Sequence, residues 1–179
     1  MVDRLSYYIY LISSLPMLHF TMKPPFPFGK LLQACQDLIS GGDINILKAA
    51  SISGEYGQRS SQLTLKRWQN FDTALRNELV KIRAARRHVD FLNYIRESEY
   101  EDFSLVHIAM NAYRNPSILE GERMLDRERW HFLEKSALGH YFDLDFLIIY
   151  ALKLLILDRW ETIYGANAPR ALEETLLKS

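Results

Sequence analysis

Hydrophobic side chains recur at helical spacing through most of the chain after residue 28. The clearest run begins near Ser61 and continues to about Ser98. Its large apolar residues share one arc at about 100° of rotation per residue; they are Trp68, Phe71, Leu75, Leu79, Ile82, Val89 and Leu92. The pattern predicts a long central helix of roughly 35 residues, about 50 Å at the helical rise. We therefore expect an elongated molecule.

Shorter periodic runs predict further helices before and after this one. Gly41-Gly42 ends the first, Asn115-Pro116 restarts the chain after a short helix, and Asp143 caps a helix that stops at Gly165. The predicted ranges are 28–40, 43–50, 103–114, 118–138, 143–164 and 170–178, with residues 51–61 as a loop. The fold class is therefore all-α, a multi-helix bundle.

The first 27 residues carry a different pattern. Residues Leu5–Ile12 are rich in Tyr and Ile, which favour strands, and Ser13, Ser14 and Pro16 follow them. Three prolines between residues 23 and 28 lack amide donors and fix their own backbone, so that segment is a stiff connector. We expect an extended, Pro-rich arm over 1–27, with a possible short strand, and a helical body over 28–179, together one domain.

Composition excludes several classes of function. Lys plus Arg and Asp plus Glu each number 22, so the net charge is zero, and a nucleic-acid binder is not expected. The single cysteine, Cys35, excludes an internal disulfide and a Cys-based zinc site and fits a reducing compartment. The longest apolar stretch, Leu144–Leu157, contains Asp145 and Lys153 and is shorter than the about 20 residues a bilayer span needs. The Tyr- and Leu-rich start lacks the features of a signal peptide and is interpreted as part of the fold.

Candidate catalytic and metal-binding residues are few. Glu128 and His131 have the helical i,i+3 spacing of di-iron carboxylate bundles, but the second Glu-x-x-His pair of such a site is missing. Asp143 and Asp145 follow His140, and a helix cap and the helix dipole explain both carboxylates. Nearby acidic residues of 120–134 have basic partners three or four positions away. We expect no enzyme activity, no cofactor and no metal.

Basic residues gather in the second half of the predicted long helix. Arg76, Arg83 and Arg87 share one stripe, which is typical of a solvated face or of a surface for an acidic protein partner. Lys153 lies between Leu152 and Leu154, where it needs a carboxylate partner or a path to the surface. It also marks a possible docking place for another protein.

Three segments carry a family resemblance. The first contains Tyr7-Tyr8, Ser14-Leu15-Pro16, Leu18, Phe20 and Lys23-Pro24-Pro25. The last contains Phe142-Asp143-Leu144-Asp145, Tyr150, Lys153-Leu154 and Leu157-Asp158-Arg159-Trp160, and Arg129-Trp130 and Leu133-Glu134 lie between them. Together they resemble a bacterial family of unknown function whose members are typically encoded among V-type ATPase subunits. That family is in turn distantly similar to the C/d group of V-type ATPase subunits.

The resemblance implies a non-catalytic helical subunit at the central stalk. Members of the C/d group join the rotor shaft to the proteolipid ring, so stalk or ring subunits are the implied partners. The implied location is cytoplasmic and peripheral to the inner membrane, with the membrane contacted only through partners. Proteins of the C/d group are nearly twice as long and contain three similar bundles, whereas no internal repeat occurs here.

Aromatic residues near the Pro-rich arm are the expected partner-binding residues, because aromatic side chains are enriched at interfaces. They are Tyr7, Tyr8, Phe26 and Phe28, which could equally be core anchors. Two other functions stay open. One is a free-standing helical interaction or regulatory protein unrelated to the ATPase, and the other is a carboxylate metalloenzyme built on Glu128 and His131.

Overall fold

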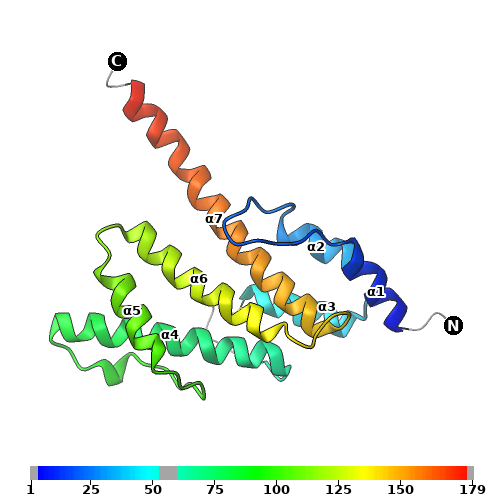
Figure 1. The fold of residues 1–179 in the computed structure, drawn as a ribbon, viewed down its shortest axis with the longest axis horizontal. Coiled ribbons are helices and arrows are strands. Elements are labelled where there is room, and N and C mark those ends of the chain that lie inside the picture. Colours follow the sequence, from blue (N-terminus) through cyan, green and yellow to red (C-terminus); the bar gives the residue numbers. More distant parts are fainter. Residues whose placement is uncertain (1–3, 53–59, 177–179) are drawn as a thin grey trace. The chain divides into compact units, whose positions relative to one another are not determined.

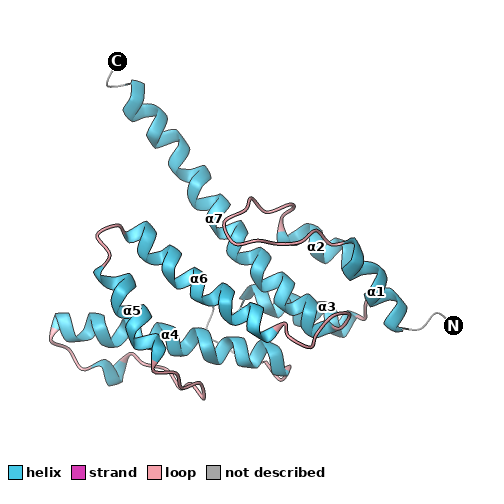
Figure 2. Ribbon diagram, in the orientation of Figure 1, coloured by secondary structure: helices cyan, strands magenta, loops and turns pink. Residues whose placement is uncertain are grey.

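The described chain is helical (Figures 1 and 2). The computed structural model describes residues 4–52 and 60–176, and over those ranges it contains helices and loops but no strand. The elements are α1 (Arg4–Ser14), α2 (Phe28–Cys35), α3 (Gly41–Ile52), α4 (Leu63–Arg87), the 3-10 turn η1 (Phe91–Asn93), α5 (Ser104–Arg114), α6 (Ile118–Ser136) and α7 (Leu144–Leu176). The all-α fold class is confirmed.

These elements form two compact units. The first is built from α1, α2, α3 and α7, and the second from α4, η1, α5 and α6. Two predictions depend on how these units are joined: that residues 1–179 form a single domain, and that the molecule is elongated. Both remain predictions.

Helix α7 is the centre of the first unit and packs against α2 and α3. Leu147, Ile148, Ile149 and Tyr150 are all buried, and four consecutive residues point to all sides of a helix. Neighbouring parts of the chain therefore surround α7 over this stretch. Leu31 of α2 and Leu47 of α3 complete the core.

The second unit is centred on stacked aromatic rings. Helix α5 packs against α4 and α6. The rings of Phe71 and Phe132 are stacked with their centroids 4.1 Å apart, and Tyr100 meets Phe71 edge-on at 5.4 Å. Residues Leu65, Phe71, Leu75, Leu105 and Leu133 are almost completely buried. Offset and edge-to-face ring pairs contribute about 0.5–1.5 kcal/mol beyond the area they bury.

The predicted extended arm over residues 1–27 is wrong for its first part, including the possible strand at Leu5–Ile12, whereas residues 15–27 are a loop, as expected. The segment Leu5–Ile12 lies within the helix α1. Leu11 and Ile12 are buried, Tyr7 and Tyr8 are half-buried, and Ile9 and Tyr10 between them are exposed. This spacing of four places one apolar stripe along a helix, and burial of that stripe outweighs the weak strand preference of Tyr and Ile.

The predicted long helix is shorter than expected. Helix α4 has 25 residues and ends where His88 adopts a left-handed conformation with φ of 55°. The chain then turns back, and Asn77 of α4 bonds both the amide and the carbonyl of Arg96. Val89 and Leu92, predicted on the buried face, are therefore exposed. The αL cap at His88 supplies the stop that glycine more often provides.

Several helix boundaries also differ from prediction. The sequence places an N-cap at Asp43 for the helix 43–50, at Asn115 for the helix 118–138 and at Ser60 or Ser61 for the long helix. In the structure Ser40 accepts the amide hydrogen bond that begins α3, Ser117 caps α6 and Gln62 caps α4. In each case a polar side chain one to three positions away satisfies the free amides at the start of the helix.

Helix α7 does not stop at Gly165. Its backbone continues to Leu176, so the separate last helix expected over 170–178 is wrong for the part that is described. Pro169 lacks the amide that would bond the carbonyl four residues earlier, on Gly165, so α7 continues past this proline without that one hydrogen bond. Residues 53–59 of the expected loop 51–61 and residues 177–178 of that helix lie outside the described residues.

Cys35 provides a simple test of the core of the first unit. Its side chain is completely buried in α2, and burial raises the pKa of the thiol to about 11. At about pH 8, where thiols are usually labelled, very little of Cys35 is therefore in the reactive thiolate form. We expect Ellman's reagent to leave the folded protein unlabelled and to react with one thiol per chain after denaturation. Rapid labelling of the folded protein would contradict the packing described.

Candidate functional site

The first and the last of the three motif segments that carry the family resemblance meet in the first unit. The Tyr150 hydroxyl donates to the carbonyl oxygen of Pro16 at 2.9 Å, and burial raises the pKa of that hydroxyl to about 12. Lys23 Nζ pairs with Glu161 Oε1 at 3.1 Å. Residues more than 130 positions apart are thus joined at the Pro-rich connector.

Phe26 and Phe28 of that connector are both half-buried. Phe28 begins α2, and its amide donates to Asp158 Oδ2 of α7 at 2.9 Å. This carboxylate takes the place of a side-chain cap, since Pro27 at the N-cap offers none. Burial raises the pKa of Asp158 above its usual value, and the amide hydrogen bond partly opposes that rise.

Tyr7 and Tyr8 are also half-buried rather than exposed. The Tyr8 hydroxyl donates to Asp43 Oδ2 of α3 at 2.9 Å, which ties α1 to α3. Among the side chains of α1 that are described, from Tyr7 onward, the large exposed ones are instead Ile9 and Tyr10, which the sequence did not single out. The helical period of this segment, had it been preferred to strand propensity, would have indicated them.

The predicted basic stripe divides into two parts. Arg76 Nη2 pairs with Asp72 Oδ2 of the same helix at 2.8 Å. Arg83 and Arg87 are exposed in the last two turns of α4. Nearby, Arg86 Nη1 donates to the Tyr113 hydroxyl at 3.0 Å. Only the end of the stripe is therefore placed as a partner surface would require.

Lys153 is half-buried on α7, between the buried Leu152 and Leu154. That exposure agrees with the expectation that the ammonium group either finds a partner or reaches the surface.

A buried ionic cluster connects α4 and α6 in the second unit. Arg129 Nε donates to Asp72 Oδ1 at 2.8 Å, and its Nη1 donates to Asp126 Oδ1 at 2.9 Å. All three side chains are buried. The spacing of three between Asp126 and Arg129 predicts their pairing, but nothing in the sequence indicates the contact with Asp72, 57 positions away. The cluster is fully partnered, so it fits a structural role.

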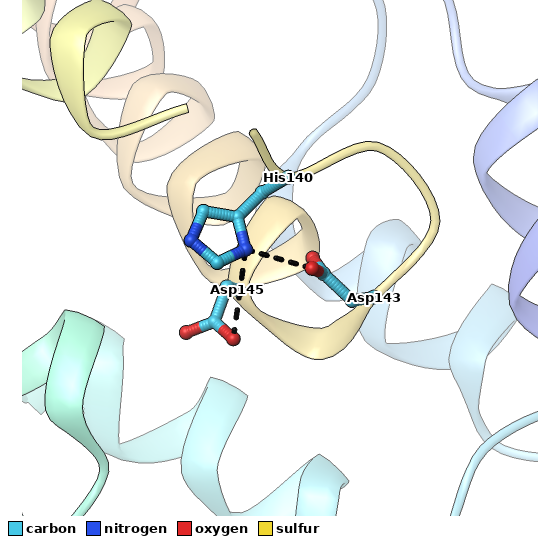
Figure 3. Close-up of side chains that lie close together, drawn as sticks. All are labelled: His140, Asp143 and Asp145. Atoms are coloured by element: carbon cyan, nitrogen blue, oxygen red, sulfur yellow. Dashed lines mark hydrogen bonds and ion pairs between the residues drawn. The ribbon is translucent and has the colours of Figure 1, made fainter. Parts of the chain in front are cut away.

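His140, Asp143 and Asp145 lie close together before and within the first turn of α7 (Figure 3). His140 Nδ1 is 2.7 Å from Asp143 Oδ2 and 3.9 Å from Asp145 Oδ2. One nitrogen and two carboxylate oxygens within 4.8 Å of one another could hold a metal ion. However, Asp143 Oδ1 accepts the amide of Phe146 at 2.8 Å, and the positive end of the helix disfavours a cation there. The geometry therefore favours a helix cap.

The cap can be tested by substitution. Asp143→Ala is expected to lower the free energy of unfolding by about 1 kcal/mol, because the Phe146 amide loses its partner. Asp143→Asn keeps an accepting oxygen and should retain most of that stability in thermal or urea unfolding. If Zn²⁺ stabilised the wild-type protein but not the His140→Ala variant, the cluster would be a metal site instead.

Glu128 and His131, the predicted metal pair, show no such convergence. His131 Nδ1 lies 3.8 Å from Glu134 Oε2 on the exposed side of α6. Neither Glu128 nor His131 belongs to the group of possible metal ligands found among the described residues. A metalloenzyme built on this pair stays a prediction that the geometry does not favour.

The fold and these contacts define an all-helical protein whose described polar clusters have structural partners. Comparison with family models then identifies it further. The model of the family described as "Protein of unknown function (DUF2764)" matches residues 50–169, and the chain belongs to that family. Searches of curated proteins and of solved structures found no match.

Proposed function

We propose that this chain is a non-catalytic subunit of a bacterial V-type ATPase. Its role is that of an accessory or central-stalk connector similar to the C/d group, acting through protein–protein contacts in proton or sodium transport. Its place is the cytoplasmic face of the inner membrane, where other subunits hold it. No helix of the described residues is long and apolar enough to cross a bilayer.

The observation that carries the proposal is the meeting of the first and the last motif segments. Pro16 bonds to Tyr150, Phe28 to Asp158, and Lys23 to Glu161. Of these six residues, Pro16, Lys23, Tyr150 and Asp158 are motif residues of the resemblance. Motif residues that contact one another in the fold are better evidence of common ancestry than apolar residues that match one by one. These contacts therefore support the family resemblance on which the proposal rests.

The polar clusters support a role without chemistry. Among the described residues, the buried side-chain nitrogen and oxygen atoms all have hydrogen-bond partners. Arg129 is held by two carboxylates, and Asp143 caps a helix. A catalytic group needs a free, oriented donor or acceptor facing substrate, and these residues are engaged in holding the fold.

Affinity purification tests the proposal. The tagged chain is recovered from gently solubilised membranes of its own host, and its partners are identified by mass spectrometry. We expect V-type ATPase stalk or proteolipid-ring subunits in fixed proportion to the chain. An unrelated helical protein carrying the same tag is the control. A defined soluble partner without ATPase subunits would instead establish the free-standing interaction protein.

A further inference from the structure

The six residues 89–94 that follow the cap of α4 include four large apolar side chains that are exposed. Val89, Phe91, Leu92 and Tyr94 have exposed fractions of 45%, 38%, 63% and 59%. We call these four residues the apolar turn. Exposed apolar side chains gathered in one short segment of a folded protein are typical of a surface that contacts a protein or a membrane.

The apolar turn is held in a defined conformation. The amides of His88 and Val89 donate to carbonyls in the last turn of α4, which fixes the direction of the chain as it leaves the helix. The amides of Tyr94 and Ile95 both donate to the carbonyl of Phe91. The side chains are thus presented by hydrogen-bonded backbone, so little ordering is needed when they are covered.

Basic residues outnumber acidic ones in the sequence around the apolar turn. Residues 78–96 contain five Lys or Arg side chains and two carboxylates, Glu78 and Asp90, in a chain whose total charge is zero, and Lys81 pairs with Glu78. Asp90 Oδ1 is occupied by the Leu92 amide at 2.9 Å. Arg83 and Arg87 are exposed one helical turn apart. The balancing carboxylates follow in sequence, at Glu97, Glu99, Glu101 and Asp102.

We propose that the apolar turn and the arginines at the end of α4 bind the surface of an anionic lipid bilayer. Guanidinium groups bind phosphate oxygens, and Val, Leu, Phe and Tyr side chains lie at the boundary between headgroups and acyl chains. The apolar residues lie on a short hydrogen-bonded turn, and a fluid bilayer can receive them without a preformed pocket. An acidic protein would have to supply a matching hollow. This contact is independent of the proposed function and adds direct lipid binding to attachment through partners.

Vesicle binding tests this proposal with the full-length chain. We expect sedimentation with phosphatidylcholine vesicles that contain phosphatidylglycerol, and little with phosphatidylcholine alone. Loss of two basic residues near such a surface costs about thirtyfold in binding, and the reversed charges add repulsion, so Arg83→Glu with Arg87→Glu should weaken binding about thirtyfold or more. Added salt should weaken it as well. Leu92→Ser should weaken binding about tenfold through the lost apolar contact.

A fluorescence reporter places the contact. Tyr94→Trp should shift its emission to shorter wavelength when anionic vesicles are added, over a background in which Trp68, Trp130 and Trp160 are buried. Matched controls are Arg67→Glu, an exposed arginine early in α4, and Ile118→Ser, an exposed apolar residue on α6. Both should bind as the wild type does.

Two results would overturn the proposal. One is equal binding of wild type and of the Arg83→Glu, Arg87→Glu variant to anionic vesicles. The other is that the wild-type chain does not sediment with anionic vesicles. If it instead binds a purified acidic protein, and the Arg83→Glu, Arg87→Glu variant does not, the turn belongs to a protein partner. Neither result bears on the copurification of ATPase subunits with the chain, so the two proposals fail separately.

Discussion

Arg129→Ala is expected to lower the free energy of unfolding by about 3–5 kcal/mol, because it removes the cation beside the buried carboxylate of Asp126 and leaves Asp72 paired with Arg76. Asp126 is almost wholly inaccessible to water, at 1% exposure. The loss should appear in urea unfolding as a lower midpoint with an unchanged slope. It is the largest single effect that the structure predicts for a polar residue.

The matched control lies on the same helix. Arg123 Nη1 pairs with Glu120 Oε1 at 3.1 Å on the surface of α6, with the same spacing of three as Arg129 and Asp126. Arg123→Ala is expected to cost no more than about 0.5 kcal/mol, because exposed pairs are screened by water. Equal losses in the two variants would mean that the Arg129 cluster is solvated and that its burial is wrongly described.

Gly121→Ala should destabilise the second unit by about 1–3 kcal/mol. A Cβ atom added at Gly121 of α6 would lie 2.6 Å from the carbonyl oxygen of Ala112 on α5, closer than such atoms approach. The obstacle is backbone, so the two helices have to separate. Gly121→Leu should cost more, and thermal unfolding monitored by circular dichroism measures both.

Gly165→Ala is the control for the change of glycine to alanine itself. A Cβ at Gly165 of α7 meets nothing within 4 Å, so this variant should be more stable than wild type by up to about 1 kcal/mol. If Gly121→Ala also stabilised the protein, the close approach of α5 and α6 would be contradicted.

The fold was predictable where local signals agree with packing. Asp143 caps α7 as the sequence indicates, and the apolar stretch of that helix is buried on all sides. Helix α1 was missed because Tyr and Ile prefer strands, whereas the spacing of Leu11 and Ile12 from Tyr7 and Tyr8 is helical. The end of α4 was missed because His88 adopts positive φ, a conformation that glycine usually signals.

The candidate sites were less predictable than the helices. The buried Arg129 is paired with Asp72, which lies on another helix. The pattern of charges along one helix predicts only pairs three or four positions apart, so it does not indicate this contact. The contact of Gly121 with Ala112 is likewise a property of two packed helices. The basic stripe was found from sequence, but the exposed apolar turn beside it required knowledge that α4 ends at Arg87.

The central claim is that this chain is a fixed, non-catalytic subunit of a V-type ATPase. Its most direct test mixes the purified chain with the detergent-solubilised V-type ATPase of the same host, prepared from cells that lack the chain, and separates them by size. We predict that the chain migrates with the ATPase at a constant ratio that saturates as more is added. Migration of the chain alone at every ratio, with the ATPase intact, would contradict the account.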